Sequence, residues 1–148
     1  MGAGVGRSTP QCLVQRHLVL QLRQPHLHHG LLNASFISAW LPAVGHHEVL
    51  IADAGSWAET GRIPVKGQPV FVMARPDGRQ VWVNFAFPDN EWVQVIDTVE
   101  RRVVHTFSPG KAVLHMEFTP RGEHVWLSSR DSNRVSIVDT ATFAVLKE

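Results

Sequence analysis

The stretch Arg75-Pro-Asp-Gly-Arg-Gln-Val-Trp82 decides the fold, because it returns 44 residues later as Thr119-Pro-Arg-Gly-Glu-His-Val-Trp126. A third tryptophan, Trp40, precedes Trp82 by 42 residues. Aspartates recur at similar intervals, at Asp53, Asp97 and Asp139. A period of about 40 to 45 residues made of short strands is typical of β-propeller blades. The sequence therefore predicts an all-β fold, a partial β-propeller whose repeat begins near Trp40.

Short β-rich runs separated by Pro, Gly, Asn and Asp turns fill this repeat, as in antiparallel all-β folds. We expect strands at residues 48–52, 60–65, 70–75, 80–85, 93–97, 103–107, 113–118, 124–128 and 134–139. Four strands make one blade, so residues 40–148 hold about two and a half blades. A complete ring typically has about 4 to 8 blades. We therefore expect part of a ring, poorly soluble by itself because one blade face stays open.

The repeated residues first predict packing. Each tryptophan is expected to fill the wedge between adjacent blades, where a large ring buries apolar surface. Each aspartate directly precedes a turn, and its carboxylate is expected to accept hydrogen bonds from the backbone of that turn.

Residues 1–39 lack the repeat. None of the 13 Asp and Glu residues precedes Glu48, whereas average domains contain about 25% charged residues. A transit peptide, a disordered extension and sequence from outside the normal reading frame are all open; we expect a disordered or out-of-frame segment. Polar residues interrupt the apolar run at 13–22, so no signal peptide is recognised and the compartment, cytoplasmic or periplasmic, stays open.

Composition argues against several classes of function. The net charge of +1 predicts no strong attraction to nucleic acid. No apolar run reaches the roughly 18 residues of a membrane-spanning helix. The single Cys12 excludes an internal disulfide framework. We predict no metal site.

The residues within the repeat carry a more specific signal than its period. Residues 61–85 and the run Pro109–Gly122 resemble the d1-haem propeller family, and His115-Met-Glu-Phe-Thr-Pro120 is the most specific part. This family includes the catalytic domain of cytochrome cd1 nitrite reductase and relatives that help to make haem d1. The chain resembles the biosynthetic members most.

The resemblance implies an eight-bladed ring that holds a d1-type tetrapyrrole (haem d1 or a precursor) above its central channel. It implies a late role in haem d1 biosynthesis, either as a dehydrogenase-like enzyme acting on tetrapyrrole side chains or as a carrier. Other haem d1 assembly proteins and nitrite reductase are the implied protein partners. Two pocket histidines of nitrite reductase align near Val44 and at Arg75, so the proton donors that reductase uses are missing here.

Four residues are candidates for binding the tetrapyrrole. Arg75 can pair bidentately with a carboxylate, or it can be a solvated turn arginine. Lys66 and Lys111 occupy matching places in successive blades and can ring a pocket mouth, although exposed turn lysines are common. His115 is a weak catalytic or ligand candidate. Strand alternation places it beside Glu117, opposite Leu114 and Met116, where the pair can orient an imidazole or contact a neighbouring blade.

Two other functions stay open from the sequence. A general propeller-repeat module can use its rim to bind a protein partner. The chain can also be an inactive fragment of a longer protein.

Overall fold

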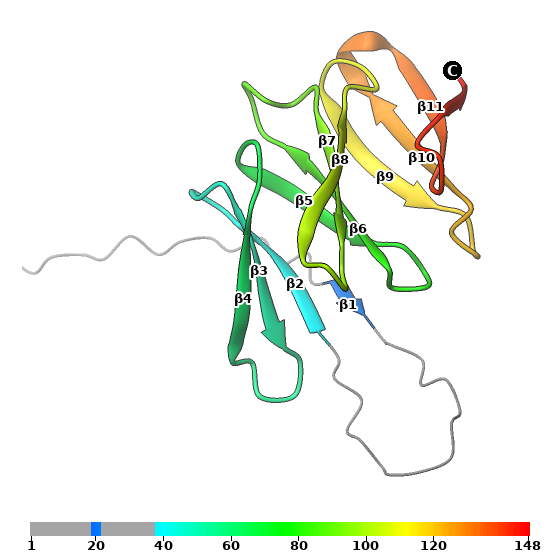
Figure 1. Ribbon diagram of the computed structural model, residues 1–148. Coiled ribbons are helices and arrows are strands. Elements are labelled where there is room, and N and C mark those ends of the chain that lie inside the picture. Colours follow the sequence, from blue (N-terminus) through cyan, green and yellow to red (C-terminus); the bar gives the residue numbers. More distant parts are fainter. Residues whose placement is uncertain (1–18, 22–37) are drawn as a thin grey trace, which may run out of the picture.

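The computed structural model describes residues 19–21 and 38–148, which form three four-stranded antiparallel sheets. Figure 1 shows the sheets side by side along the chain, the first from blue to green and the third from yellow to red. The first sheet contains β1 (Val19–Gln21), β2 (Ser38–Ala43), β3 (Glu48–Asp53) and β4 (Glu59–Pro64). The second contains β5 (Pro69–Ala74), β6 (Gln80–Phe85), β7 (Val93–Asp97) and β8 (Arg102–Phe107). The third contains β9 (Val113–Phe118), β10 (His124–Ser129), β11 (Arg134–Asp139) and β12 (Val145–Lys147), with a 3-10 turn, η1 (Arg130–Ser132), between β10 and β11.

In every sheet the strands follow one another in chain order, which is the meander of a propeller blade. The partial β-propeller predicted from the repeat is confirmed. Four strands have the bounds that were predicted, at 80–85, 93–97, 113–118 and 134–139. Three strands were not predicted: β1, β2 and the short β12. The expectation that residues 1–39 are disordered or out of frame falls mainly on positions 1–18 and 22–37, which lie outside the described residues.

The core lies between the sheets, in two clusters. The first packs Trp40, Val49 and Ile51 of the first sheet against Val81, Phe85 and other residues of the second. The second packs Trp82 and Val95 against Met116, Leu127 and Val138 of the third sheet. The rings of Phe107, Phe118 and Phe143 surround Trp82 at centroid distances of 5.8, 5.9 and 6.1 Å. Each cluster buries apolar surface from two sheets, so each sheet needs its neighbour.

The tryptophan prediction is confirmed for two positions and wrong for the third. Trp40 is 2% exposed and Trp82 is completely buried, both between sheets. Trp126 is 50% exposed, because the described residues place no sheet against its side of the third sheet.

The aspartate prediction is confirmed at all three turns. Asp53 Oδ1 accepts from the N–H groups of Gly55 and Ser56, at 3.1 and 2.7 Å. Asp97 Oδ1 accepts from the backbone N–H of Val99, and Asp139 Oδ1 from that of Thr142. These bonds close the turn between the third and fourth strands of each sheet. Among the described residues, no helix is long and apolar enough to cross a membrane.

Candidate functional site

The first strands of the sheets form the candidate inner edge of the propeller. Contacts between sheets run mainly between β5 and the strands β1 and β2, and between β9 and β6. The sheets therefore converge at their first and second strands. Since β5 and β9 each stand first in their sheet, their outer edges have no neighbouring strand of that sheet. Residues on these two strands and at their ends are therefore the candidates for contacting a ligand.

Asn84 fixes the distance between the two inner strands. Its buried side chain accepts a hydrogen bond from the Phe71 N–H at 2.9 Å and donates to the Val113 carbonyl at 2.8 Å. The first bond holds β5 where its register with β6 shifts. The second bond crosses to β9, so one side chain joins β5, β6 and β9.

Arg75 directly follows β5 and its guanidinium already has partners. It pairs with the Asp77 carboxylate at 2.5 Å and donates to Thr140 Oγ1 at 3.3 Å. The side chain is only 16% exposed. A Cβ added at Gly122, where φ is +79°, would lie 2.7 Å from Arg75 Cγ. Arg75 therefore packs into the corner between the second and third sheets, and its hydrogen bond holds the pKa of the Asp77 carboxyl below the usual range.

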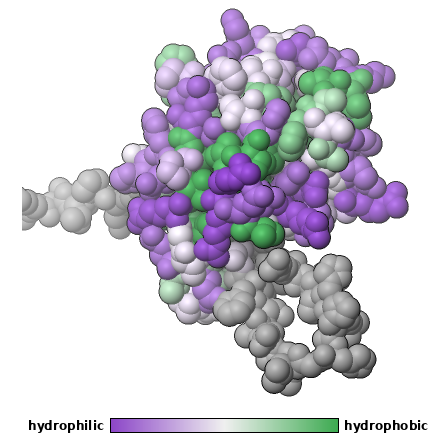
Figure 2. All heavy atoms as spheres, in the orientation of Figure 1, coloured by the Kyte–Doolittle hydropathy of each residue, from purple (hydrophilic) through white to green (hydrophobic). Residues whose placement is uncertain are grey.

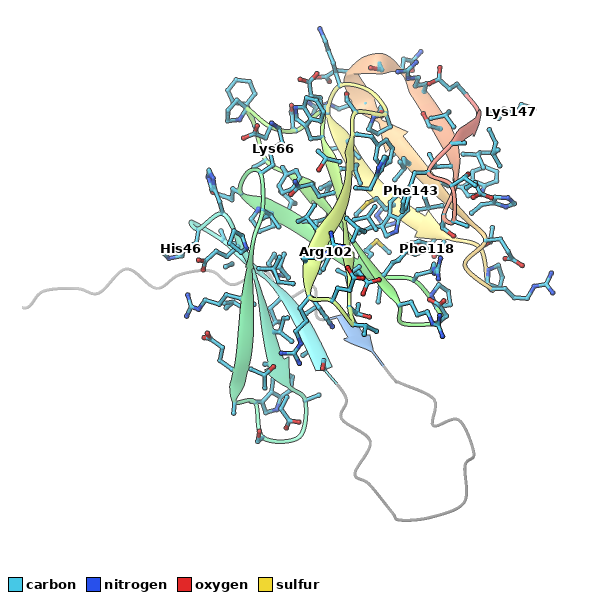
Figure 3. All side chains as sticks on the ribbon, viewed as in Figure 1. His46, Lys66, Arg102, Phe118, Phe143 and Lys147 are labelled. Carbon is cyan, nitrogen blue, oxygen red and sulfur yellow. The ribbon has the colours of Figure 1, made fainter. Side chains whose placement is uncertain are left out.

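Lys66 and Lys111 precede β5 and β9 in matching places, as the repeat predicted. Lys66 Nζ lies 4.6 Å from the centre of the Trp92 ring, a cation–π distance. The Lys111 N–H donates to Ser132 Oγ at 2.8 Å. Figure 3 shows Lys66 on a loop near His46, and the Val65 N–H bonds the His47 carbonyl at 2.9 Å.

The structure brings the two lysines to one end of the sheets and Arg75 to the other. Lys66 precedes β5 and Arg75 follows it. A strand of six residues spans roughly 20 Å, at about 3.3 Å per residue. The four candidate cations and ligands therefore do not form one cluster. Val44, in the turn between β2 and β3, also lies at the lysine end. Val44 and Arg75 therefore lie at opposite ends of the strands.

His115 lies on β9 and contacts both Glu117 and Phe71. Its Nε2 is 3.5 Å from Glu117 Oε2, and both side chains are exposed. The Phe71 ring meets the imidazole edge-on at 6.2 Å between centroids. The predicted pairing with Glu117 is confirmed. The predicted alternation is wrong for Leu114, which is exposed while Met116 is buried, because the register of β9 on β10 shifts at this point.

A hollow of about 190 Å³ opens at the lysine end, between the second and third sheets. Its walls are mostly apolar and include Val70, Phe71, Phe87 and Leu114, with Arg130 at the rim. Phe87 is 84% exposed, and Arg130 Nε donates to Asp131 at 2.7 Å. Sequence reasoning missed both residues, because they lie in loops after β6 and β10 where the repeat is weakest. Phe87 follows β6 and Arg130 follows β10, each the second strand of its sheet, and this shared position was the available signal.

Among the described residues, no three His, Cys, Asp or Glu side chains gather into a group that could hold a metal ion. Chemically, the inner edge offers apolar contact area, cations at both strand ends and one histidine–carboxylate pair. These groups can contact apolar surface and pair with anionic groups.

Comparison with known proteins identifies the family of this chain. The family model described as "Cytochrome D1 heme domain" matches residues 15–148. The match begins ahead of Trp40, where the repeat starts. "Protein NirF" of Pseudomonas aeruginosa is 52% identical over 117 residues, covering 79% of this chain and 29% of that protein. "Protein NirF" of Stutzerimonas stutzeri is 49% identical over 125 residues, covering 84% of this chain and 32% of that protein.

Solved structures support the fold. The dihydro-heme d1 dehydrogenase NirN, in complex with DHE, has a TM-score of 0.68 and 21% identity over 76% of this chain and 25% of its own. Hydrazine synthase of Kuenenia stuttgartiensis has a TM-score of 0.67 and 20% identity, over 74% of this chain and 31% of its own. The chain spans about a third of the length of the curated relatives it matches. With a family match over 134 of its 148 residues (15–148), the chain belongs to the cytochrome d1 haem domain family.

Proposed function

We propose that this chain serves haem d1 biosynthesis by holding a d1-type tetrapyrrole at the inner edge formed by β5 and β9. The observation that carries the proposal is the 52% identity to Protein NirF of P. aeruginosa, within the cytochrome d1 haem domain family. The tetrapyrrole is substrate or cargo, handled late in assembly by side-chain modification or by carriage. A propeller module for a protein partner is not favoured, because the matched relatives are d1-type proteins.

The residues proposed to contact the tetrapyrrole fall into two groups. At one end, Lys66 and Lys111 precede β5 and β9, and their charges can pair with carboxylate substituents. At the other end, Arg75 occupies the position that aligns with a pocket histidine of nitrite reductase. Its guanidinium would have to exchange Asp77 for a ligand carboxylate. Because β5 separates the two groups, they would contact opposite edges of one ligand. Alternatively, only one of the two groups contacts the ligand.

His115 lies between the two ends and is proposed as the acid–base or ligand residue. Its Nε2 lies 3.5 Å from Glu117 Oε2, a contact that can orient the imidazole. Both groups are exposed, so they can reach a ligand in the channel.

The experiment is an absorption titration of the 148-residue chain with a d1-type tetrapyrrole, using NirF of P. aeruginosa as the reference. We expect a saturable shift of the Soret band. A lost carboxylate contact should weaken binding about ten- to a hundredfold. Arg75→Ala therefore tests one end, Lys66→Ala with Lys111→Ala tests the other, and His115→Ala tests the middle.

Arg121→Ala is the matched control, because Arg121 occupies the exposed turn of the third sheet that corresponds to Asp77 in the second. Its affinity should equal that of the unchanged chain. No Soret shift with excess tetrapyrrole would contradict the proposed function for this chain. A shift that none of the variants weakens would remove these four residues from the site and leave the function standing.

A further inference from the structure

We propose that the hollow between the second and third sheets is a subsite for one short carbon chain that ends in a carboxylate. Phe87 forms an apolar wall of this subsite and Arg130 supplies its charge. The inference rests on the proposed function in naming a d1-type tetrapyrrole as the molecule that carries the chain. It adds two residues, which follow β6 and β10, to the four candidates described above.

The size of the hollow limits what can enter it. Its volume is about 190 Å³, and an apolar protein cavity of about 150 Å³ holds one benzene molecule. A tetrapyrrole macrocycle joins several rings nearly as large as benzene, so only a substituent of the ligand fits. The buried Asn84 amide in the wall already accepts from the Phe71 N–H and donates to the Val113 carbonyl. An apolar chain in the hollow therefore leaves Asn84 with both of these partners.

The exposure of Phe87 is unusual for a large apolar side chain. Phe87 is 84% exposed, more than any other large apolar side chain in the part of the chain that the structure describes. Figure 2 shows hydrophilic residues over most of the face that it draws. The second sheet packs against both the first and the third, so Phe87 is not exposed for want of a neighbouring sheet. Contact with a ligand would remove its ring from water and so favour binding.

The loop that carries Phe87 is held in place before a ligand binds. At its start, the Ala86 N–H donates to the Gln68 carbonyl at 2.9 Å, just ahead of β5. Near its end, the Asn90 carbonyl accepts from the Val113 N–H of β9 at 2.8 Å. The loop is thus tied to both sheets that form the hollow. Little of its conformational freedom is lost on binding, which favours affinity.

Arg130 gives the hollow its charge. Of the described residues that line the hollow, it alone carries a charged side chain. Its backbone N–H donates to the Ala112 carbonyl at 2.9 Å, which fixes the residue at the rim. Its guanidinium pairs with the Asp131 carboxylate, but both side chains are exposed, and such pairs contribute little to stability. A ligand carboxylate can therefore replace Asp131 and accept hydrogen bonds from two N–H groups of the guanidinium.

The first experiment is an absorption titration of the 148-residue chain with a d1-type tetrapyrrole and with the methyl ester of the same compound. Arg130→Ala should weaken binding of the free acid about tenfold and leave the affinity for the ester unchanged, because only the acid pairs with the guanidinium. Phe87→Ala should weaken binding of both compounds about tenfold, because both make the apolar contact. Phe87→Leu keeps an apolar wall and should retain most of the affinity.

Arg102→Ala and Val99→Ala are the matched controls. Arg102 forms a similar exposed pair with Glu100. Val99 is 66% exposed in the turn between β7 and β8, at the other end of the second sheet from Phe87. The affinities of both controls should equal those of the unchanged chain. A Soret shift that Arg130→Ala and Phe87→Ala leave unaltered would overturn the subsite and leave the proposed function standing.

A second experiment tests the hollow without the tetrapyrrole. The probe is hydrocinnamate, a benzene ring with a short chain that ends in a carboxylate, and the measurement is the NMR shift of the Asn84 side-chain amide. We expect a saturable shift that Arg130→Ala weakens and Arg102→Ala does not change. This shift without any Soret change would contradict the proposed function and support the hollow as a carboxylate site. An Asn84 amide that stays in place at every probe concentration would overturn the subsite.

Discussion

The second and third sheets share the residues of the repeat but differ in what packs against them. Trp82 and Trp126 occupy one position of the repeat, on the second strand of each sheet. Trp82 contacts three phenylalanines, two of them from the third sheet, whereas half of Trp126 is exposed. The burial of a blade residue therefore depends on the adjacent sheet. The same indole is core in one place and half-exposed in the other.

Removing each indole is the strongest test of this difference in burial. Trp82→Ala deletes a completely buried ring and should lower the free energy of unfolding by about 3–5 kcal/mol. Trp126→Ala should cost less than about 1 kcal/mol, because half of its ring is already in water. Urea unfolding at protein concentrations where the chain is monomeric measures both. Equal losses would mean that the third sheet is as well covered as the second.

Replacing Asn84, whose side chain joins the second and third sheets, tests the contact between these two sheets. Asn84→Ala removes the cross-sheet bond to Val113 and the bond that the Asn84 side chain accepts from the Phe71 N–H, which should cost about 1–3 kcal/mol. Ser128 is the corresponding residue of the third sheet and bonds only the backbone of His115. Ser128→Ala should cost less, about 0.5 kcal/mol. Urea unfolding is again the measurement, and a reversed order would contradict the bridging role of Asn84.

The acid dependence of stability gives the smallest expected effect. The hydrogen bond from Arg75 lowers the folded-state pKa of Asp77, so the carboxylate contributes stability above its unfolded pKa of about 4. That contribution is lost as the pH falls through the lower folded pKa. Asp77→Asn should therefore flatten the loss of stability below about pH 4.

Asp131 on the third sheet is the counterpart. Arg130 lowers its pKa as well, but the pair is exposed to solvent and its interaction is screened. Asp131→Asn should change the acid dependence less than Asp77→Asn. Thermal unfolding followed at several acidic pH values distinguishes the two. The same change in both variants would show that burial against the third sheet adds nothing to the Arg75 pair.

The sequence was sufficient for the strands of the repeat and for their turns, because both depend on local chemistry. Alternating apolar residues and Pro-Asp-Gly turns predicted β6 and β7 to the residue. The three aspartate turns followed from the position of each carboxylate before its turn. Short β12 and the isolated β1 were missed, since three-residue strands carry almost no periodic signal.

The candidate site was predicted less well, because it depends on which ends of the strands meet. Lys66 and Arg75 are nine residues apart in the sequence, yet a whole strand separates them. Val44 and Arg75 likewise lie at opposite ends of the strands. The exposure of Leu114 depended on a shift of register, which alternation alone does not reveal. Phe87 and Arg130 follow the second strands β6 and β10 in connections that differ between the sheets, so the repeat pointed to them only weakly.

Asn84 has a consequence for how such a ring can evolve. Its amide is satisfied only when the next unit offers a carbonyl at the start of its inner strand, as Val113 does. The corresponding Ser128 keeps its hydroxyl within its own unit. A unit that carries such an amide therefore depends on one particular neighbour. A change in the order of these units would leave the buried Asn84 amide without its partner. The units are therefore not interchangeable.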